Sequence, residues 1–402
     1  MFSSKPKIIT DQDKIDELLN RGVEEIFVRE HLKESLLSGK RLRVKLGIDP
    51  TSPTIHLGRS IPLRKLKAFQ DLGHKIIFII GDFTAKIADP SDKLEKRPML
   101  ADEEIKTNYK DYLKQVGKII DVSKSEIHYN SKWLAKMSVF ETAKLLESFT
   151  LQQMSKRRNF HERLEKKQDV FISELIYPAL QGYDSFQVKA DVEIGGFDQL
   201  FNLKAGRTVQ KRYGQKEQDV MTLSMLLGTD GRKMSSSWGN TISLLDDNKD
   251  MFGKIMSIQD NLIIQYFTLC TDLELSSIEN FENELKNGRN PKDIKIKLAY
   301  EIVRLYHGEK LAKEAKENFE NTFAKRGIPN DTTEVFVARG SLLSDILLSE
   351  NIIFSKTEWR RLISDGAVTL MENNLEITDQ EAKVLEGTYK IGKRRFVKIK
   401  TI

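Results

Sequence analysis

One segment near the N-terminus most limits what this chain can fold into. An apolar run, residues 42–48, leads into a turn-forming stretch that ends in a helix-like run at residues 61–72; the stretch reads Gly47-Ile48-Asp49-Pro50-Thr51-Ser52-Pro53-Thr54-Ile55-His56-Leu57-Gly58-Arg59. A second apolar run, Lys75–Ile80, completes a strand–helix–strand order. This order predicts a parallel sheet with a right-handed crossover. Ligands of such sheets bind at the carboxyl ends of the strands, where Gly47 and Asp49 fall.

The turn before this helix has features of a phosphate-binding site. A helix N-terminus directs backbone N–H groups and a positive dipole end toward an anion. His56 and Gly58 stand at the helix entrance, and Gly58 lacks a Cβ, so a flat base can lie close to the backbone. A single His before a Gly at a helix start is more often a cap or a surface residue. The segment alone is therefore weak evidence.

A second segment far along the chain strengthens the interpretation. Lys233-Met234-Ser235-Ser236-Ser237 offers one ammonium and three hydroxyls, which suit a pyrophosphate. Alone, such a run is typical of a solvated loop. The usual triphosphate loop, GxxxxGK[ST], does not occur in the sequence. Together the two segments indicate a site that holds ATP from two sides.

Composition narrows the class of protein. The 402 residues include 39% hydrophobic residues and are enough for two or three domains. Cys270 is the one cysteine, so neither a disulfide framework nor a Cys-based zinc site can form, and we expect a reducing compartment. No apolar run has the length of a membrane span, and residues 1–13 lack the hydrophobic core of a signal peptide. We expect a cytoplasmic protein.

The charge balance is less decisive. The chain has 65 basic and 59 acidic residues, a net charge of +6. This excess suits a polyanionic partner, but an ordinary solvated surface explains it equally well.

The pattern of apolar residues predicts three domains. Residues 1–245 form an α/β domain with helices over 14–38, further strands at 188–194 and 219–227, and a charged, mostly helical insertion over about 100–170. Residues 246–328 show only helical spacing. Residues 327–331 are typical of a linker, and residues 335–402 alternate helix-like and strand-like runs, which predicts a small α+β domain.

A polar face is expected on one helix of the first domain. Tyr177, Gln181 and Asp184 are spaced by four and three residues, so they fall on one side of a helix. A phenol, an amide and a carboxylate together can line a polar pocket. The alternative is a helix with an ordinary exposed polar face.

These segments resemble those of a known family. The residues His56–Arg59 resemble the HIGH signature of class I aminoacyl-tRNA synthetases, and Lys233–Ser237 resembles their KMSKS signature. The segments 177–185 and 191–199 are similar to those of tyrosyl-tRNA synthetases. The resemblance covers essentially the whole chain and is strongest over 45–100 and 174–240. It implies a Rossmann-like catalytic domain that uses ATP, with Mg²⁺ carried by the nucleotide.

The resemblance also implies a role for each matching residue. The residues implied in catalysis are Thr51, His56, Arg59 and Lys233. Those implied in ATP binding are Gly47, Asp49, His56, Gly58, Gly195, Gly196, Asp198, Lys233 and Ser235. Those implied in tyrosine binding are Asp89, Tyr177, Gln181, Asp184 and Gln199, with Asp184 accepting a hydrogen bond from the phenol. No protein ligand to a metal is expected.

The sequence departs from the family pattern at several positions. Arg59 replaces the second His of the HIGH signature, and Ser236 replaces the second Lys of KMSKS. Lys45 stands where many bacterial relatives have a tyrosine near the substrate phenol, and Asp82 is a candidate to act there instead. Ala88 precedes Asp89 where Gly is usual.

The C-terminal domain resembles an αL RNA-binding module. An Arg-containing helix, residues 356–363, is followed by Gly366, and six of the eleven residues over 390–400 are Lys or Arg. A charge run is more often a solvated face, but here it combines with a turn and a strand, which favours contacts with the RNA backbone. The residues expected to contact tRNA are Arg360, Arg361, Lys393, Arg394 and Arg395. The helical domain before it is implied in anticodon recognition.

The activity that the resemblance implies is ligation of tyrosine to tRNA(Tyr). One alternative is a tryptophanyl-tRNA synthetase-like enzyme, which shares the fold but not the Tyr177/Gln181/Asp184 helix. Another is an RNA-binding paralogue without charging activity, against which His56 and Lys233 argue. The family also implies a homodimer whose interface lies in the insertion, with one tRNA spanning both subunits.

Overall fold

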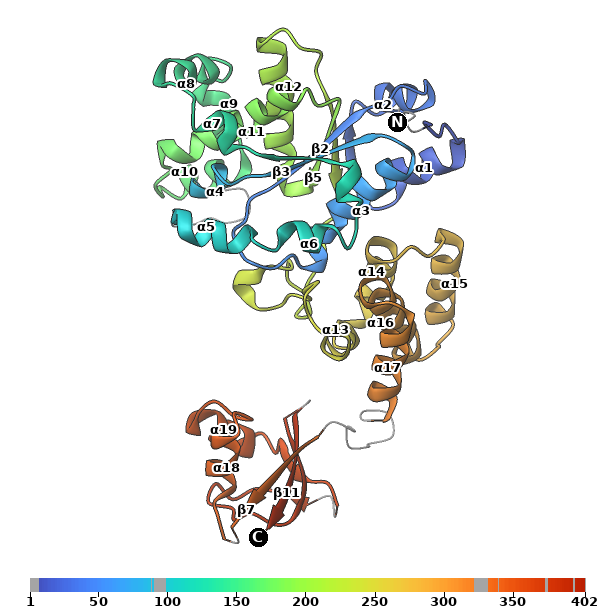
Figure 1. Cartoon of the computed structure of the whole chain (residues 1–402), viewed down its shortest axis with the longest axis vertical. Coiled ribbons are helices and arrows are strands. Elements are labelled where there is room, and N and C mark those ends of the chain that lie inside the picture. The colour runs from blue at the N-terminus through green and yellow to red at the C-terminus, as the bar shows by residue number, and fades with distance from the viewer. Residues whose placement is uncertain are drawn as a thin grey trace. The chain divides into compact units, whose positions relative to one another are not determined.

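The computed structural model describes residues 7–87, 89, 99–321, 332–338, 340–372, 375–392 and 395–401. The chain separates into two compact units, Met1–Glu309 and Lys310–Ile402, which are described separately (Figure 1). The predicted division into three domains, at residues 245 and 328, stays a prediction. The predicted linker over 327–331 lies outside the described residues.

The first unit is built on a six-stranded sheet with the order β1-β6-β5-β2-β3-β4. Its strands are β1 (Val23–Phe27), β2 (Arg43–Ile48), β3 (Lys75–Ile80), β4 (Glu126–Tyr129), β5 (Val192–Gly196) and β6 (Asp219–Leu223). All neighbouring strands are parallel except β1, which is antiparallel to β6. The predicted α/β fold with a parallel sheet is confirmed.

Two predicted elements differ from the structure. The prediction of helices throughout 14–38 is wrong, because β1 lies between α1 (Gln12–Asn20) and α2 (Arg29–Leu37). Gly22, with φ +64°, turns the chain after α1, and the short strand gains its backbone partners from β6. The strand predicted over 188–194 starts later, because α11 (Ile172–Val188) continues to residue 188.

The sheet creates a crevice between β2 and β5. The helix α3 (Leu57–Asp71) connects β2 to β3, and α12 (Leu200–Arg212) connects β5 to β6 on the other side. Because both crossovers are right-handed, they lie on opposite faces of the sheet, as Figure 1 shows. The chain therefore leaves the carboxyl ends of β2 and β5 in opposite directions, and a ligand can enter between them.

Further helices lie between β3 and α11 and from β6 to residue 319, and all but α17 belong to the first unit. Those from β3 to α11 are α4 (Thr84–Ile87), α5 (Asp102–Tyr109), α6 (Tyr112–Val116), α7 (Ser131–Leu134), α8 (Val139–Leu146), α9 (Leu151–Ser155) and α10 (Arg158–Glu165). Those after β6 are α13 (Asn248–Met256), α14 (Ile263–Cys270), α15 (Leu275–Lys286), α16 (Pro291–His307) and α17 (Glu309–Phe319), the last beginning at the boundary of the two units. The spacing of Ile294, Leu298 and Ile302 predicted α16, and all three side chains are buried.

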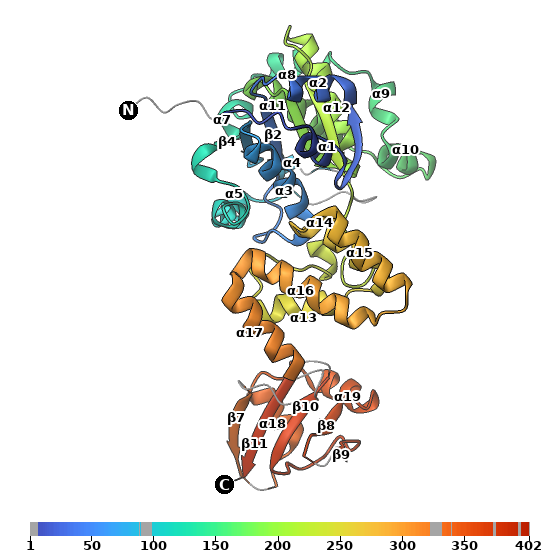
Figure 2. The same ribbon diagram turned by 90° about the vertical axis from the view of Figure 1, so that its right-hand side faces the viewer.

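The second unit has a five-stranded sheet with two helices packed on its core. The order β7-β11-β10-β8-β9 comprises β7 (Thr333–Val337), β8 (Val368–Leu370), β9 (Leu375–Glu376), β10 (Gly387–Ile391) and β11 (Arg395–Thr401), which lie side by side in Figure 2. The helices are α18 (Leu343–Ser349) and α19 (Lys356–Ser364). Leu343, Trp359 and Tyr389 belong to the shared core. In the described part of the chain, no helix is long and apolar enough to cross a membrane.

The helix α11 packs closely against α12 at Gly182. A Cβ at Gly182 would lie 2.8 Å from Val209 Cγ2 and 2.9 Å from the carbonyl oxygen of Ala205, both on α12. Such distances are shorter than van der Waals contact, so no larger side chain fits without displacing one helix.

We therefore expect Gly182→Ala to lower the free energy of unfolding by about 1–3 kcal/mol, because it overpacks this contact. The matched control is Gly253→Ala in α13, where a Cβ meets no atom within 4 Å. The control should raise stability by about 0.5–1 kcal/mol, since Gly is a poor helix former. Urea unfolding of both variants tests the contact, and equal effects would contradict it.

Candidate functional site

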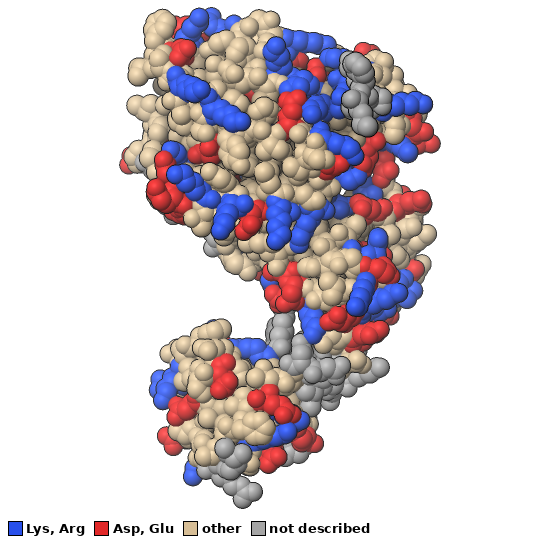
Figure 3. All heavy atoms as spheres, in the orientation of Figure 1, with Lys and Arg blue, Asp and Glu red and all other residues tan. Residues whose placement is uncertain are grey.

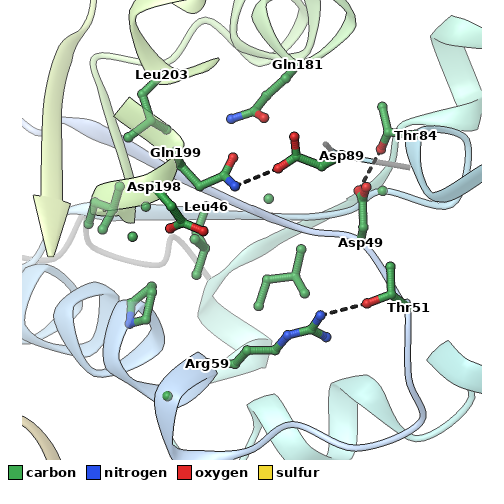
Figure 4. Close-up of a pocket in the computed structure, with 18 of the residues that line it drawn as sticks. Leu46, Asp49, Thr51, Arg59, Thr84, Asp89, Gln181, Asp198, Gln199 and Leu203 are labelled. Carbon is green, nitrogen blue, oxygen red and sulfur yellow. Dashed lines mark hydrogen bonds between the residues drawn. The ribbon is translucent and has the colours of Figure 1, made fainter. Parts of the chain in front are cut away.

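A cavity of about 580 Å³ lies at the carboxyl ends of β2, β3 and β5. Every residue predicted to contact ATP or tyrosine lines it, and Figure 4 shows several of their side chains pointing toward one another. These residues are Gly47, Asp49, Thr51, His56, Gly58, Arg59, Asp89, Tyr177, Gln181, Asp184, Gly195, Gly196, Asp198, Gln199, Lys233 and Ser235. Their contacts with a ligand stay predictions.

His56 is a neutral group at the start of α3. It caps the helix, and its Nδ1 accepts a hydrogen bond from the backbone N–H of Arg59 at 3.4 Å. Burial, with smaller contributions from the cations Arg59 and Lys233, lowers the His56 pKa to about 3. Since Nδ1 accepts, the proton is on Nε2, which can donate to a phosphate oxygen.

Arg59 fixes the turn that follows β2. Its Nη2 donates to Thr51 Oγ1 at 2.7 Å, as Figure 4 shows, and its Nη1 donates to the hydroxyl of Tyr112 at 3.2 Å. Tyr112 in turn donates to the carbonyl oxygen of Ser52 at 2.6 Å. Arg59 thus places a permanent cation in the cavity and orients Thr51.

The two signature segments meet at the cavity. Lys233 Nζ lies 2.9 Å from Asp198 Oδ2, and the hydroxyls of Ser52 and Ser236 are 3.4 Å apart. The backbone N–H of Ser235 donates to Asn240 Oδ1 at 2.9 Å. Segments 180 residues apart in sequence therefore form one wall of the cavity, which places Lys233 beside the N-terminal end of α3.

Asp49 is a carboxylate held by two hydroxyl donors. It accepts from Thr84 Oγ1 at 2.7 Å and from the Tyr177 hydroxyl at 2.9 Å. Burial raises its pKa to about 7, although both hydrogen bonds oppose this shift. A Cβ at Gly81 would overlap Asp49 Oδ1, so the close approach of this loop requires glycine.

Asp184 lies at the deep end of the polar face of α11. Its side chain is 4% exposed and accepts from Trp133 Nε1 at 2.7 Å and from Asn130 Nδ2 at 3.1 Å. Burial raises its pKa to about 6. Sequence reasoning missed Asn130 and Trp133, because nothing in their local pattern shows which carboxylate they approach.

Asp82 does not take the place proposed for it near the substrate phenol. Its two oxygens accept from the backbone N–H of Ser131 at 2.9 Å and from the Ser131 hydroxyl at 2.6 Å. It is not among the residues that line the cavity. Asp82 instead holds the start of α7, the short helix that carries Trp133.

Lys45 forms a buried ion pair beneath α11. Its Nζ lies 2.8 Å from Glu193 Oε1, 2.8 Å from Ser185 Oγ and 3.1 Å from the carbonyl oxygen of Gln181. Glu193 also accepts from the side-chain amide of Gln181 at 3.0 Å. The sequence showed Lys45 only as a departure from the family; in the fold it holds the helix that carries the predicted tyrosine-binding residues.

Asp89 is surrounded by donors. It accepts from Gln199 Nε2 at 2.6 Å, from Arg157 Nη2 at 2.8 Å and from Asn202 Nδ2 at 3.4 Å. Arg157 and Asn202 were not predicted. Ala88, the neighbouring departure from the family, lies outside the described residues.

The predicted RNA-binding residues differ in their surroundings. Arg360 and Arg361 are exposed on α19. Arg395 donates to the carbonyl oxygen of Ile352 and lies 2.9 Å from Glu358, so it contributes to the fold of the unit. Lys393 and Arg394 lie outside the described residues. On the face in Figure 3, basic and acidic side chains are interspersed.

The basic tail is partly neutralised by the neighbouring strand. Lys398 and Lys400 of β11 lie 2.6 Å and 3.0 Å from the two carboxylate oxygens of Glu334 on β7. Of the basic residues predicted to contact tRNA, Arg360 and Arg361 are therefore the exposed ones that the structure describes.

The described residues also bear on the expectation about metals. Within the parts of the chain given above, no group of three or more His, Cys, Asp or Glu side chains is arranged to hold a metal ion.

Comparisons with known proteins agree with this geometry. The sequence profile described as "tRNA synthetases class I (W and Y)" matches residues 37–324. A tyrosine–tRNA ligase of Thermotoga maritima is 42% identical over 394 residues, covering 97% of this chain and 98% of that protein. One of Carboxydothermus hydrogenoformans is 43% identical over 397 residues, covering 95% and 97%.

Solved structures share the fold. The tyrosyl-tRNA synthetase of Archaeoglobus fulgidus, complexed with L-tyrosine, is 26% identical with a TM-score of 0.61, covering 76% of this chain and 99% of that one. The tryptophanyl-tRNA synthetase of Plasmodium falciparum is 17% identical with a TM-score of 0.58, covering 78% and 90%, and shows the fold alone. This chain belongs to the family of class I tRNA synthetases (W and Y).

Proposed function

We propose that the chain is a tyrosine–tRNA ligase, which activates tyrosine with ATP and transfers it to tRNA(Tyr). The observation that carries the proposal is Asp184, a buried carboxylate at the deep end of the cavity, held by Trp133 and Asn130. A phenol would give this carboxylate a third donor. Phenylalanine would not supply this third donor. A site built to bind a substrate hydroxyl can favour the correct substrate over an analogue that lacks it by a factor of roughly 10⁴–10⁵ in kcat/KM. The similarity to tyrosine–tRNA ligases of Thermotoga maritima and Carboxydothermus hydrogenoformans supports the same substrate.

In the first step, the tyrosine carboxylate attacks the α-phosphorus of ATP. The P–O bond to the leaving pyrophosphate breaks, and tyrosyl-adenylate forms. The attacking carboxylate is already ionised, so no protein base is required. The protein supplies position and charge: Asp184 orients the phenol end, and the carboxylate Asp89 binds the α-ammonium.

The leaving pyrophosphate is neutralised from two sides. Lys233 and Arg59 supply cations, and His56 supplies a neutral Nε2–H donor. Mg²⁺ bound to ATP would reduce the net negative charge of the phosphates. In the second step, a ribose hydroxyl of the tRNA terminus attacks the carbonyl carbon of the adenylate, and AMP leaves.

The insertion offers a surface for a second copy of the chain. Its helices α8 and α9 expose the large apolar side chains Val139 (89%), Phe140 (79%) and Leu151 (67%), and Ile172 (78%) at the start of α11 follows directly. A monomer rarely leaves an apolar patch of this kind in water. We propose a homodimer through this surface, with one tRNA reaching both subunits. Sedimentation velocity tests it: a monomeric mass at micromolar concentration would exclude the dimer.

Tyrosine-dependent exchange of pyrophosphate into ATP tests the function. The parent chain should exchange with tyrosine and not with tryptophan or phenylalanine. Tryptophan-dependent exchange would favour the tryptophanyl alternative, and tRNA binding without exchange would favour the RNA-binding paralogue. In Asp184→Ala, we expect the tyrosine-to-phenylalanine ratio to fall at least about 100-fold, because the phenol loses its partner.

The control for this variant is Asp198→Ala. Asp198 is a carboxylate in the same cavity, but it lies beside Lys233, on the side expected to bind ATP. Its loss should weaken ATP binding and leave the amino-acid ratio within about threefold. If both variants changed the ratio equally, Asp184 would have no special contact with the phenol.

The raised pKa of Asp184 predicts a pH dependence of tyrosine binding. The group titrates near pH 6 in the folded chain. Below this pH the carboxyl group is protonated and can no longer accept from Trp133, Asn130 and the phenol together. We expect the tyrosine Kd to rise below about pH 6, by up to tenfold per pH unit. Calorimetric titration from pH 5 to 8 measures it, and an affinity independent of pH would contradict the assignment.

Exposed arginines of α19 should set the salt dependence of tRNA binding. Arg360→Ala and Arg361→Ala should each lower the slope of log K against log salt by about one phosphate contact. The matched control is Lys398→Ala, because Glu334 already neutralises that cation. Filter-binding assays at about 50 to 300 mM salt measure this slope for each variant. A larger effect of Lys398→Ala would place the RNA on β11.

A further inference from the structure

We propose that Arg157, a residue of the insertion, is a positioning residue for amino-acid binding that acts through Asp89. This inference rests on the proposed function, because Asp89 is the expected partner of the substrate α-ammonium. Arg157 Nη2 lies 2.8 Å from Asp89 Oδ1, whereas Gln199 Nε2 donates to Oδ2 at 2.6 Å. The carboxylate is thus held at both oxygens, by groups from two different parts of the chain.

Arg157 approaches Asp89 from outside the cavity. Asp89 and Gln199 line the cavity and point toward each other in Figure 4, whereas Arg157 is not among the lining residues. The Arg157 side chain is 4% exposed in this ion pair. A residue so placed does not touch a substrate in the cavity, so its effect on binding must pass through Asp89.

The surroundings of Arg157 hold the guanidinium in one place. Its Cζ lies 5.3 Å from the ring centroid of Phe160 and 5.9 Å from that of Phe201. Aromatic rings at these distances attract a cation. Among the residues that the structure describes, its other terminal nitrogen, Nη1, is buried without a hydrogen-bond partner. A buried donor without a hydrogen bond costs free energy of folding. An arginine whose role was stability alone would be expected to form hydrogen bonds with both terminal nitrogens.

The charges of the cavity explain why Asp89 needs such a partner. Asp49 and Asp184 line the same cavity, and Asp89 is one of the charges that raise the pKa of Asp49. Like charges in a buried site repel one another. The Arg157 cation offsets this repulsion at Asp89 and fixes the orientation of its carboxylate.

Arg157 also connects the insertion to the amino-acid site. It directly precedes α10 and follows α9, the two helices that expose Leu164 and Leu151. The packing of these helices therefore determines where the guanidinium lies, and with it the orientation of Asp89.

The test measures tyrosine-dependent pyrophosphate exchange with the full chain. Arg157→Met should raise the tyrosine KM about 10- to 100-fold, because a misplaced Asp89 binds the ammonium poorly. The KM for ATP should stay within about threefold, and kcat should change less than the tyrosine KM. Arg157→Lys keeps the positive charge but lacks the planar guanidinium group, so its tyrosine KM should lie between those of the parent chain and Arg157→Met.

Arg163→Met is the matched control. Arg163 is another buried arginine of α10, paired with Glu174 at 2.7 and 2.9 Å, and it does not line the cavity. Its loss should lower thermal stability without a selective rise in the tyrosine KM. An equal rise for Arg163→Met would mean that any damage to the insertion has this effect and would overturn the proposal.

A double-mutant cycle decides whether Arg157 acts through Asp89. In the Asp89→Asn background, Arg157→Met and Arg157→Lys should have little further effect on the tyrosine KM. An effect that persists there, or a tyrosine KM unchanged by either single variant, would overturn the inference. If Arg157→Met does not fold, the same comparison is made with Arg157→Lys. A parent chain without tyrosine-dependent exchange would instead refute the proposed function.

Discussion

The ion pair between Lys45 and Glu193 fixes the geometry on which the rest of the site depends. The two residues are register partners on adjacent strands β2 and β5, and their side chains are both 1% exposed and 2.8 Å apart. A slip of the pairing by one residue would turn every side chain of the strand to the opposite face and leave two charges buried alone. Breaking such a pair costs about 3–5 kcal/mol. The ion pair therefore fixes the register of β2 and β5, and with it the positions of the residues at their carboxyl ends.

A fixed register matters because several carboxylates line the cavity and each depends on its own partner. Glu193 is matched by Lys45, Asp198 by Lys233 and Asp89 by Arg157. Asp49 and Asp184 have neutral donors, and their pKa values rise to about 7 and about 6. The charge pattern thus separates carboxylates that are paired with cations from two that have a raised pKa and neutral donors, and perturbed pKa values are common in functional sites.

The sequence predicted the fold and the lining of the cavity well, for a physical reason. Glycines at strand ends, a capped helix start and a run of hydroxyls are local patterns, and the resemblance assigned them to one site. The partners from the insertion could not be predicted this way. Trp133 lies on the short helix α7, whereas Asn130 and Arg157 directly precede α7 and α10, and none of them has a local sequence signal. Their contacts with Asp184 and Asp89 exist only once the chain is folded. The strand β1 was missed because its partner β6 is about 200 residues away.

The pair of Lys233 and Asp198 shows how the site can respond to its nucleotide. At 2.9 Å and with Lys233 30% exposed, the pair is accessible to solvent, so it is held less tightly than the buried pair of Lys45 and Glu193. A pyrophosphate carries more charge than one carboxylate and competes for the ammonium group. In the proposed function, Asp198 would then accept from ribose hydroxyls, which are neutral donors. This exchange would move a cation onto the leaving group and give Asp198 a new partner, while the strands beneath stay fixed by the ion pair of Lys45 and Glu193.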